Sequence, residues 1–253
     1  MSYLQITTKC NMNCPHCCDS CTMRGKHMDW STVVDAISFI RNNNEGEQIT
    51  IGGGEPTLHP RFFDILKICL ENFDYVWMAT NGSQTKTMWR LANIINQCDY
   101  ESFEREDYCT CNEDEENCYC EPQDLIYQGN KLTVALSQDY FHDSINETVV
   151  NYWEKRARQH QHSGFQIRNV TINPNNIAAQ GRAKSTGSGW GEHCVCPDFV
   201  IKPNGTIKLC GCEKSPKIGN IWNGISDHWI KKMRNSIEYQ DERCCKAFKR
   251  KGV

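Results

Sequence analysis

The sequence predicts an α/β protein, a partial (β/α)6 TIM-like barrel followed by a small C-terminal domain built from a β-hairpin and a helix. Apolar runs typical of short strands alternate with helical segments as far as about residue 172, which favours a parallel sheet of βα units. Glycine-rich or polar motifs follow several of these strands, at the ends where such barrels place their chemistry. The composition changes after a glycine-rich stretch near residue 185, which indicates a domain boundary.

The expected elements follow one another in regular order. Strands are expected at 4–8, 48–51, 75–80, 132–136 and 165–172, and helices at 30–41, 62–70, 85–95 and 144–158. The helical segments repeat apolar residues at the spacing of a buried helix face. We place the barrel at residues 1–185, with a cysteine-rich insertion at about 98–128, and the second domain at residues 186–253.

Composition limits the function. The net charge of −3 and pI near 6.2 exclude the overall basic character of many nucleic-acid-binding proteins. No stretch approaches the ~20 apolar residues of a membrane span, and the chain opens without a signal peptide, so we expect a cytoplasmic protein that does not insert into membranes. Its 17 cysteines, in short spacings, favour metal ligation over disulfides.

Two motifs carry the chemistry. Cys10, Cys14 and Cys17 form a C-x-x-x-C-x-x-C pattern directly after the first expected strand. Three thiolates can hold a [4Fe–4S] cluster and leave one iron without a protein ligand, whereas electron-transfer clusters commonly use four. The second expected strand ends in Gly52–Gly54 followed by Glu55, and glycine permits close backbone approach and positive φ.

In this order, each at a strand end, the two motifs resemble those of the radical S-adenosylmethionine (SAM) enzymes. The resemblance implies that the vacant iron binds SAM. It further implies that the cluster, reduced by a flavodoxin- or ferredoxin-type protein, cleaves SAM to a 5′-deoxyadenosyl radical that abstracts hydrogen from substrate. It assigns cofactor-binding roles to His16, Gly53, Gly54, Glu55, Asn81, Ser137 and Arg182.

Some of these assignments leave alternatives open. His16, expected near the adenine, could be a loop histidine packed beside the cluster, and Asn81 could belong to an ordinary Asn-Gly turn. Arg182 could bind a carboxylate or phosphate of a ligand, or only a surface acid. Asp139 and His142, the candidate catalytic residues, are expected to face the substrate, although Asp139 could instead cap the next helix.

A second cysteine cluster lies near the C-terminus. Cys196 and Cys210 flank two expected strands joined by an Asn-Gly turn. This hairpin resembles the opening of the twitch or SPASM extension of radical SAM enzymes, which implies an auxiliary [4Fe–4S] cluster. Zinc is the alternative metal. The further candidate ligands are Cys212, Cys244 and Cys245.

The insertion carries four more thiols, and we expect it to enter the mouth of the barrel. They could hold zinc or a further cluster, or remain reduced without a metal; they are Cys109, Cys111, Cys118 and Cys120. Cys18 and Cys21 lie just beyond the first triplet, where each could donate a hydrogen atom to substrate or be an ordinary buried thiol.

The expected function is therefore hydrogen-atom abstraction by a radical SAM enzyme. The resemblance favours a peptide or amino-acid-like substrate. The alternative substrate is a nucleoside or a modified nucleic-acid base. The alternative of a different class is a non-catalytic iron–sulfur or zinc protein, against which the open three-thiolate pattern argues. Nothing in the sequence predicts an oligomeric state.

Overall fold

The computed structural model describes residues 2–43, 48–98, 130–159, 163–169, 181–188, 199–211 and 215–228. The strands are Ser2–Thr7 (β1), Gln48–Gly53 (β2), Tyr75–Thr80 (β3), Leu132–Ser137 (β4), Phe165–Arg168 (β5), Phe199–Ile201 (β6), Thr206–Lys208 (β7), Lys217–Asn220 (β8) and Gly224–Ile225 (β9). The helices are Trp30–Asn43 (α1), Phe62–Asn72 (α2), Thr85–Gln97 (α3), Glu147–Gln159 (α4) and Gly181–Ser185 (α5), with a 3-10 turn at Pro56–Leu58 (η1).

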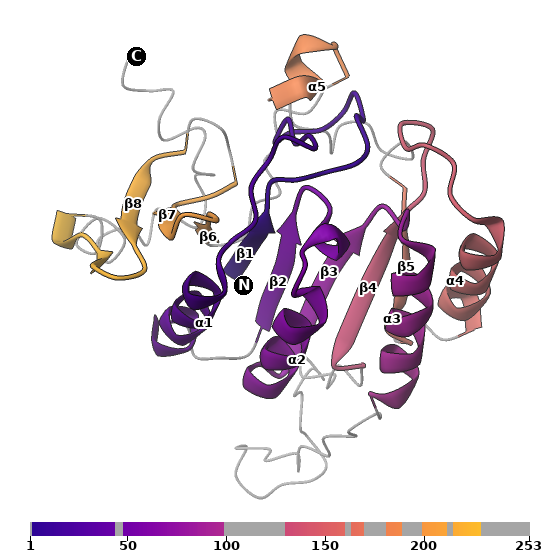
Figure 1. Cartoon of the computed structure of the whole chain (residues 1–253), viewed down its shortest axis with the longest axis horizontal. Coiled ribbons are helices and arrows are strands. Elements are labelled where there is room, and N and C mark those ends of the chain that lie inside the picture. The colour runs from indigo at the N-terminus through magenta and orange to yellow at the C-terminus, as the bar shows by residue number, and fades with distance from the viewer. Residues whose placement is uncertain are drawn as a thin grey trace, which may run out of the picture.

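All nine strands belong to one sheet in the order β5-β4-β3-β2-β1-β6-β7-β8-β9. Strands β1 to β5 pair in parallel, as the alternating pattern predicts, and β6 pairs in parallel with the other side of β1. Helices α1, α2 and α3 lie on the same side of the sheet (Figure 1). The six parallel strands and their helices confirm the prediction of an α/β fold consistent with a partial (β/α)6 barrel.

The parallel strands form the centre of the hydrophobic core. β1 and β4 are buried at five of their six positions, as expected for strands covered on both faces. The helices present apolar faces to them; Val33 of α1, Leu66 of α2 and Met88 of α3 are each at most 1% exposed. This rigid base fixes the strand ends from which the chemical motifs project.

Two element ends differ from the sequence prediction by more than two residues. Helix α4 begins at Glu147 rather than near residue 144, because the Asn146 carboxamide accepts a hydrogen bond from the Thr148 N–H at 2.9 Å and so caps the helix. Strand β5 ends at Arg168, whereas the apolar pattern suggested a strand up to residue 172. Residues 170–172 lie outside the described part of the chain.

The C-terminal hairpin extends the main sheet. Strands β6 and β7 are antiparallel, and the turn between them contains Gly205 at φ +73°, a conformation that favours glycine. β6 pairs with β1, and Trp222 beyond β8 donates from Nε1 to Asp35 of α1 at 2.8 Å. The segment thus shares hydrogen bonds with the barrel, while the division at residue 185 stays a prediction.

The insertion leaves the barrel at the edge opposite the cysteine triplet. The Asn130 carboxamide, just before β4, donates to the carbonyl oxygens of Ile95 at 2.8 Å and Cys98 at 3.1 Å, at the end of α3. A helix that connects two parallel strands runs back along the sheet and ends at the N-terminal edge of the strands. At this edge Val76 N donates a hydrogen bond to Lys131 O. The residues that flank the insertion thus lie at the edge away from the mouth. The insertion's own residues lie outside the described chain, so its entry into the mouth stays a prediction.

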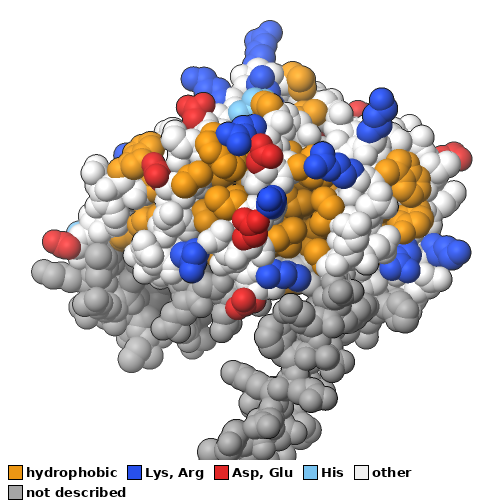
Figure 2. Space-filling model, turned by 60° about the horizontal axis from the view of Figure 1, so that its bottom comes forward, with side chains coloured by type: hydrophobic (Ala, Val, Ile, Leu, Met, Phe, Trp, Pro, Cys, Tyr) orange, Lys and Arg blue, Asp and Glu red, His pale blue; other side chains and the backbone are white. Residues whose placement is uncertain are grey.

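On the face that Figure 2 displays, neither positive nor negative side chains predominate. Basic and acidic side chains are interspersed there among hydrophobic ones (Figure 2), in keeping with the small net charge of −3. Within the described ranges, no helix has the length and apolar character needed to cross a membrane.

Candidate functional site

The cysteine loop, residues 8–29 between β1 and α1, folds back on itself above the strand ends (Figure 1). Its two arms are joined by backbone hydrogen bonds, from Thr8 N to Lys26 O at 2.8 Å and from Cys10 N to Thr22 O at 3.1 Å. A tight turn brings Cys17 N within 3.1 Å of Cys14 O. The loop is therefore a defined structure that presents its cysteines together.

The other two thiols of the triplet act electrostatically on Cys10. Burial is the main cause that raises the pKa of Cys10 to about 11; the charges of Glu55, Cys14 and Cys17 contribute to this value, and a backbone hydrogen bond at Met12 opposes it. The hydrogen bond from the Cys21 thiol lowers the pKa of Cys17 to about 6, although burial opposes that change. Cys10 thus lies within electrostatic reach of the other two thiols, which fits three protein ligands of one [4Fe–4S] cluster, and metal binding would ionise all three.

The glycine run lies directly against the start of this loop. Gly54 N donates to Thr7 O at 2.9 Å, and Glu55 N donates to Lys9 O at 2.8 Å. Gly53 has φ +149°, and a Cβ atom on Gly54 would lie 2.2 Å from Lys9 O and 3.0 Å from the Cβ atom of Cys10. Glycine at position 54 thus permits the backbone contact that joins the two motifs.

The Glu55 carboxylate has partners other than those implied by the resemblance. Oε1 accepts from Thr57 N at 3.1 Å, from the Thr57 hydroxyl at 2.6 Å and from the Thr80 hydroxyl at 2.7 Å, and Oε2 accepts from Asn81 N at 2.7 Å. Burial raises the pKa of Glu55, and these hydrogen bonds oppose that change. The side chain, 1% exposed, therefore fixes the end of β3 relative to β2.

Asn81 connects β3 to the cysteine loop. Its Nδ2 donates to Asn11 Oδ1 at 3.0 Å, and Asn11 Nδ2 donates to the Ser83 hydroxyl at 2.8 Å. Asn81 Oδ1 in turn accepts from Ser83 N at 3.0 Å. Sequence reasoning missed Asn11 and Ser83, since neither residue type carries a signal by itself; their places within the two motif loops were the available clue.

Arg182 supports the same loop from helix α5. Its Nη1 donates to Cys14 O at 2.9 Å and its Nη2 to Cys21 O at 2.7 Å. Ala183 N also donates to Cys17 O at 3.2 Å. Figure 1 shows α5 beside the cysteine loop. The guanidinium was expected to bind a ligand anion or surface acid, whereas the structure shows it bound to main-chain carbonyls that position the cysteines.

His16 lies beside Asp139 and His142, although these two residues come much later in the sequence. His142 Nδ1 lies 2.8 Å from Asp139 Oδ1, and the His16 ring centroid is 5.0 Å from that of His142. Burial lowers the pKa of His142, but hydrogen bonds to Asp139 and Cys14 outweigh it and raise the pKa to about 9. Burial and the charge of His142 lower the pKa of His16 to about 4. Ser137, 5% exposed, ends the neighbouring strand β4.

The helix-capping alternative for Asp139 is not what the structure shows. Its Oδ1 accepts from Phe141 N at 3.0 Å and binds His142, both within its own loop. Asn146 caps α4 instead. Asp139 thus organises the loop after β4, beside His16.

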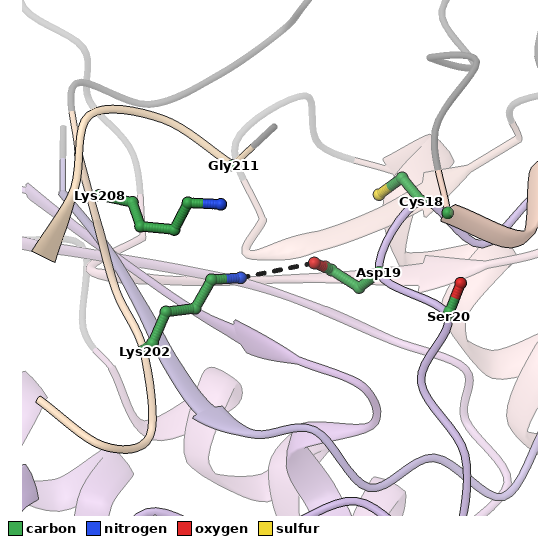
Figure 3. A pocket seen from close by; sticks show the side chains of 7 residues that line it. Cys18, Asp19, Ser20, Lys202, Lys208 and Gly211 are labelled. Atoms are coloured by element: carbon green, nitrogen blue, oxygen red, sulfur yellow. Dashed lines mark ion pairs between the residues drawn. The ribbon is translucent and has the colours of Figure 1, made fainter. Parts of the chain in front are cut away.

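A separate cavity of about 230 Å³ lies between the cysteine loop and the C-terminal hairpin. Figure 3 shows the Lys202 and Lys208 side chains reaching toward Asp19, and Lys202 Nζ lies 3.6 Å from Asp19 Oδ1. Cys18, exposed at the surface, lines the other side. The full lining is Cys18, Asp19, Ser20, Gly181, Lys202, Lys208 and Gly211.

Most candidate ligands of further metal sites lie outside the described residues. Cys210, at the end of β7, is 3% exposed, and its N–H donates to the Ser215 hydroxyl at 2.9 Å. The undescribed ones are Cys196, Cys212, Cys244 and Cys245 in the C-terminal segment, and Cys109, Cys111, Cys118 and Cys120 in the insertion.

Comparisons with known proteins agree on the N-terminal half. Residues 4–100 match the radical SAM superfamily. An S-adenosylmethionine-dependent nucleotide dehydratase of Thermoplasmatales archaeon (strain ISO4-H5) is 33% identical over 96 residues, 37% of this chain and 34% of that protein. The tungsten-containing aldehyde ferredoxin oxidoreductase cofactor-modifying protein of Pyrococcus furiosus is 31% identical over 83 residues, 32% of this chain and 23% of that protein. The alignments thus span about a third or less of these relatives' length.

Solved structures share the fold over a longer stretch. BtrN in complex with AdoMet and 2-DOIA gives a TM-score of 0.56 at 14% identity, covering 97% of this chain and 91% of that one. anSMEcpe with bound AdoMet and Cp18Cys peptide gives a TM-score of 0.51 at 13% identity, covering 95% and 81%. At these identities the likeness establishes the fold.

Fold and site together define an α/β protein with a three-cysteine loop at the C-terminal edge of a partial barrel. The match over residues 4–100 makes this N-terminal part of the chain similar to the radical SAM superfamily.

Proposed function

We propose that this protein cleaves SAM reductively at a cluster held by Cys10, Cys14 and Cys17. The contact between Gly54 and the start of the cysteine loop supports the proposal most directly, since it joins the two motifs at one place. A [4Fe–4S] cluster there would supply, with an electron from a flavodoxin- or ferredoxin-type donor, the chemistry that turns SAM into a 5′-deoxyadenosyl radical able to take hydrogen from substrate.

Residues of this chain would organise that reaction. Arg182 and Asn81 hold the cysteine loop through its main chain and through Asn11. Backbone at Gly53 and Gly54, together with Ser137 and His16, would line the SAM shell, as the resemblance implies. Asp139 and His142 would face the substrate from the loop after β4.

The test is SAM cleavage by anaerobically reconstituted protein with a low-potential reductant. Wild type should release 5′-deoxyadenosine, and the Cys10→Ala, Cys14→Ala, Cys17→Ala triple variant should release none. Cys98→Ala, which removes a thiol outside the loop, is the matched control and should keep the activity. Equal cleavage by the triple variant would overturn the proposal, and no cleavage by wild type would favour the non-catalytic metal protein.

A nucleotide is the substrate class that the cavity between loop and hairpin supports. Among the described lining residues, Lys202 and Lys208 give this cavity two cations against one acid, Asp19. The cavity also adjoins Cys18, the residue after the proposed cluster ligand Cys17. The related dehydratase is named for a nucleotide. Lys202→Gln and Lys208→Gln should each raise the KM for a nucleotide that stimulates 5′-deoxyadenosine release, whereas Lys67→Gln on the exposed surface of α2 should not.

A peptide or amino-acid-like substrate is the rival, carried by the resemblance to the twitch or SPASM extension. It predicts that peptides, and not nucleotides, stimulate 5′-deoxyadenosine release. A deuterium label should then pass between the peptide and the 5′-deoxyadenosyl group. In that case the lysine variants should leave the KM unchanged.

An auxiliary [4Fe–4S] cluster is a further part of the proposal. The buried Cys210 thiol on the hairpin supports it, with Cys196, Cys212, Cys244 and Cys245 as the remaining candidates. Iron should exceed the ~4 atoms per chain of one such cluster, and the triple alanine variant should retain iron and colour. A colourless variant that contains only zinc would assign a structural zinc site instead.

A further inference from the structure

His16, Asp139 and His142 form a compact set of metal-binding groups. One ligand atom from each lies within 4.8 Å of the other two, and all three residues are partly buried. Two imidazoles and one carboxylate are the protein ligands of many catalytic zinc sites and of ferrous facial triads. Their separate expected roles, near adenine and near substrate, do not account for this convergence.

Two atoms of the set are buried without a hydrogen-bond partner. The Asp139 side chain is 0% exposed; its Oδ1 is engaged within the loop, but its Oδ2 has no partner. Nδ1 of His16 is likewise buried and unpaired. Of the four such side-chain atoms among the described residues, two therefore belong to this one group.

Such atoms indicate a missing partner. Leaving a buried acceptor unpaired is energetically unfavourable, and more so for a charged group. Native proteins usually satisfy buried polar atoms with protein, ordered water or an ion. An ion between the Asp139 carboxylate and the His16 imidazole would satisfy both atoms at once.

We propose that His16, Asp139 and His142 bind one divalent transition-metal ion. Nδ1 of His16 and Oδ2 of Asp139 are two of the ligands, and His142, which releases its proton when the ion binds, is the third. Two ligands of a tetrahedral zinc lie about 3.4 Å apart, from bond lengths of about 2.1 Å. The three ligand atoms, which lie within 4.8 Å of one another, would therefore move closer together when the ion binds.

The site has a consequence for substrate binding. Three protein ligands leave at least one coordination position open, as in catalytic zinc sites. The set adjoins the cysteine loop, because His16 lies between Cys14 and Cys17 in the sequence. An oxygen or nitrogen donor of the substrate can occupy the open position and so be held beside the place of radical formation.

Zinc binding tests this proposal independently of SAM cleavage. Anaerobically reconstituted protein without SAM is dialysed against buffered Zn²⁺, and zinc and iron are measured in the same samples. Asp139→Asn and His16→Gln should each bind one zinc per chain fewer than wild type, with iron unchanged. Any zinc bound by cysteines elsewhere in the chain is the same in wild type and in the variants, so it does not affect the difference between them. Zinc K-edge spectra should show a nitrogen and oxygen component in wild type that both variants lose.

His27→Gln is the matched control. This imidazole is also partly buried in the same loop, but its Nδ1 already has Thr7 Oγ1 as a partner at 3.0 Å, so its removal should leave zinc unchanged. Equal zinc in wild type and in both site variants would overturn the metal site. If those variants weaken SAM affinity without changing zinc, the unpaired atoms belong to the cofactor shell and the proposal is wrong. If Asp139→Asn loses iron because it misfolds, the zinc content of His16→Gln tests the proposal instead.

Discussion

Arg182 Nη1 donates a hydrogen bond of 2.9 Å to the carbonyl oxygen of Cys14, a residue 168 positions earlier in the chain. The same guanidinium reaches Cys21 O through Nη2 at 2.7 Å. One side chain thereby holds both arms of the loop that carries the proposed cluster ligands, a role that the planar, forked guanidinium suits.

Arg182→Lys should therefore weaken retention of the cluster. A lysine ammonium cannot reproduce the forked geometry, and losing one charge-assisted hydrogen bond, about 1.5 kcal/mol, corresponds to roughly tenfold in the opening of the loop. We expect iron to be lost to a chelator about tenfold faster than from wild type, measured anaerobically by absorbance.

Lys184→Gln on the same helix is the control for Arg182, because its side chain is exposed. Unchanged iron loss in Arg182→Lys, combined with weaker SAM binding, would restore the ligand-binding role that the sequence suggested.

Gly54→Ala should push the glycine run away from the start of the cysteine loop. The new Cβ atom would lie 2.2 Å from Lys9 O and 3.0 Å from the Cys10 Cβ atom, so backbone has to move, and such overpacking typically costs about 1–3 kcal/mol. Iron incorporation and 5′-deoxyadenosine release should both fall. Gly187→Asn is the comparison, since nothing lies within 4 Å of a Cβ atom there and asparagine tolerates the positive φ. Normal iron content in Gly54→Ala would contradict the tight contact.

Glu55→Gln should destabilise the fold. Oε1 accepts from Thr57 N and Oε2 from Asn81 N, so either orientation of the amide turns its NH₂ group toward a backbone N–H. A buried donor left unsatisfied costs about 1–3 kcal/mol, and the free energy of unfolding in urea should fall by that amount. Glu71→Gln, whose side chain is 57% exposed, should change it by less than about 0.5 kcal/mol. An unchanged midpoint in Glu55→Gln would show that the carboxylate does not fix β3.

His59 should make stability depend on pH. Its Nδ1 accepts from Arg61 N at 3.1 Å, so the neutral ring donates from Nε2 to Met28 O at 2.9 Å. Burial lowers the pKa of His59, although the bond to Met28 opposes this. The unfolded chain then binds the proton more readily, so stability is fully present above the unfolded pKa of about 6.5 and is lost as pH falls below it.

The measurement for His59 is the free energy of unfolding between pH 7 and pH 5. The decline should be shallower in His59→Gln than in wild type, whereas His228→Gln, at an exposed position, should follow wild type. Identical slopes in all three proteins would rule out a contribution from His59.

Local patterns in the sequence were sufficient for the fold class and the central motifs. The spacing of Cys10, Cys14 and Cys17 is a property of one short loop, and the alternation of apolar strands with amphipathic helices repeats over each βα unit. Both signals depend on residues that are neighbours in the chain, so they can be read without knowing how distant segments pack.

Only the tertiary structure decided which partners the site residues have. Glu55 and Arg182 bind backbone groups of other segments, β6 pairs with β1, and His16 meets Asp139 and His142. These relationships depend on separations of tens to more than a hundred residues. A side chain's chemistry fixes what it is able to bind, but the packing of the sheet and loops determines which donor or acceptor lies within reach.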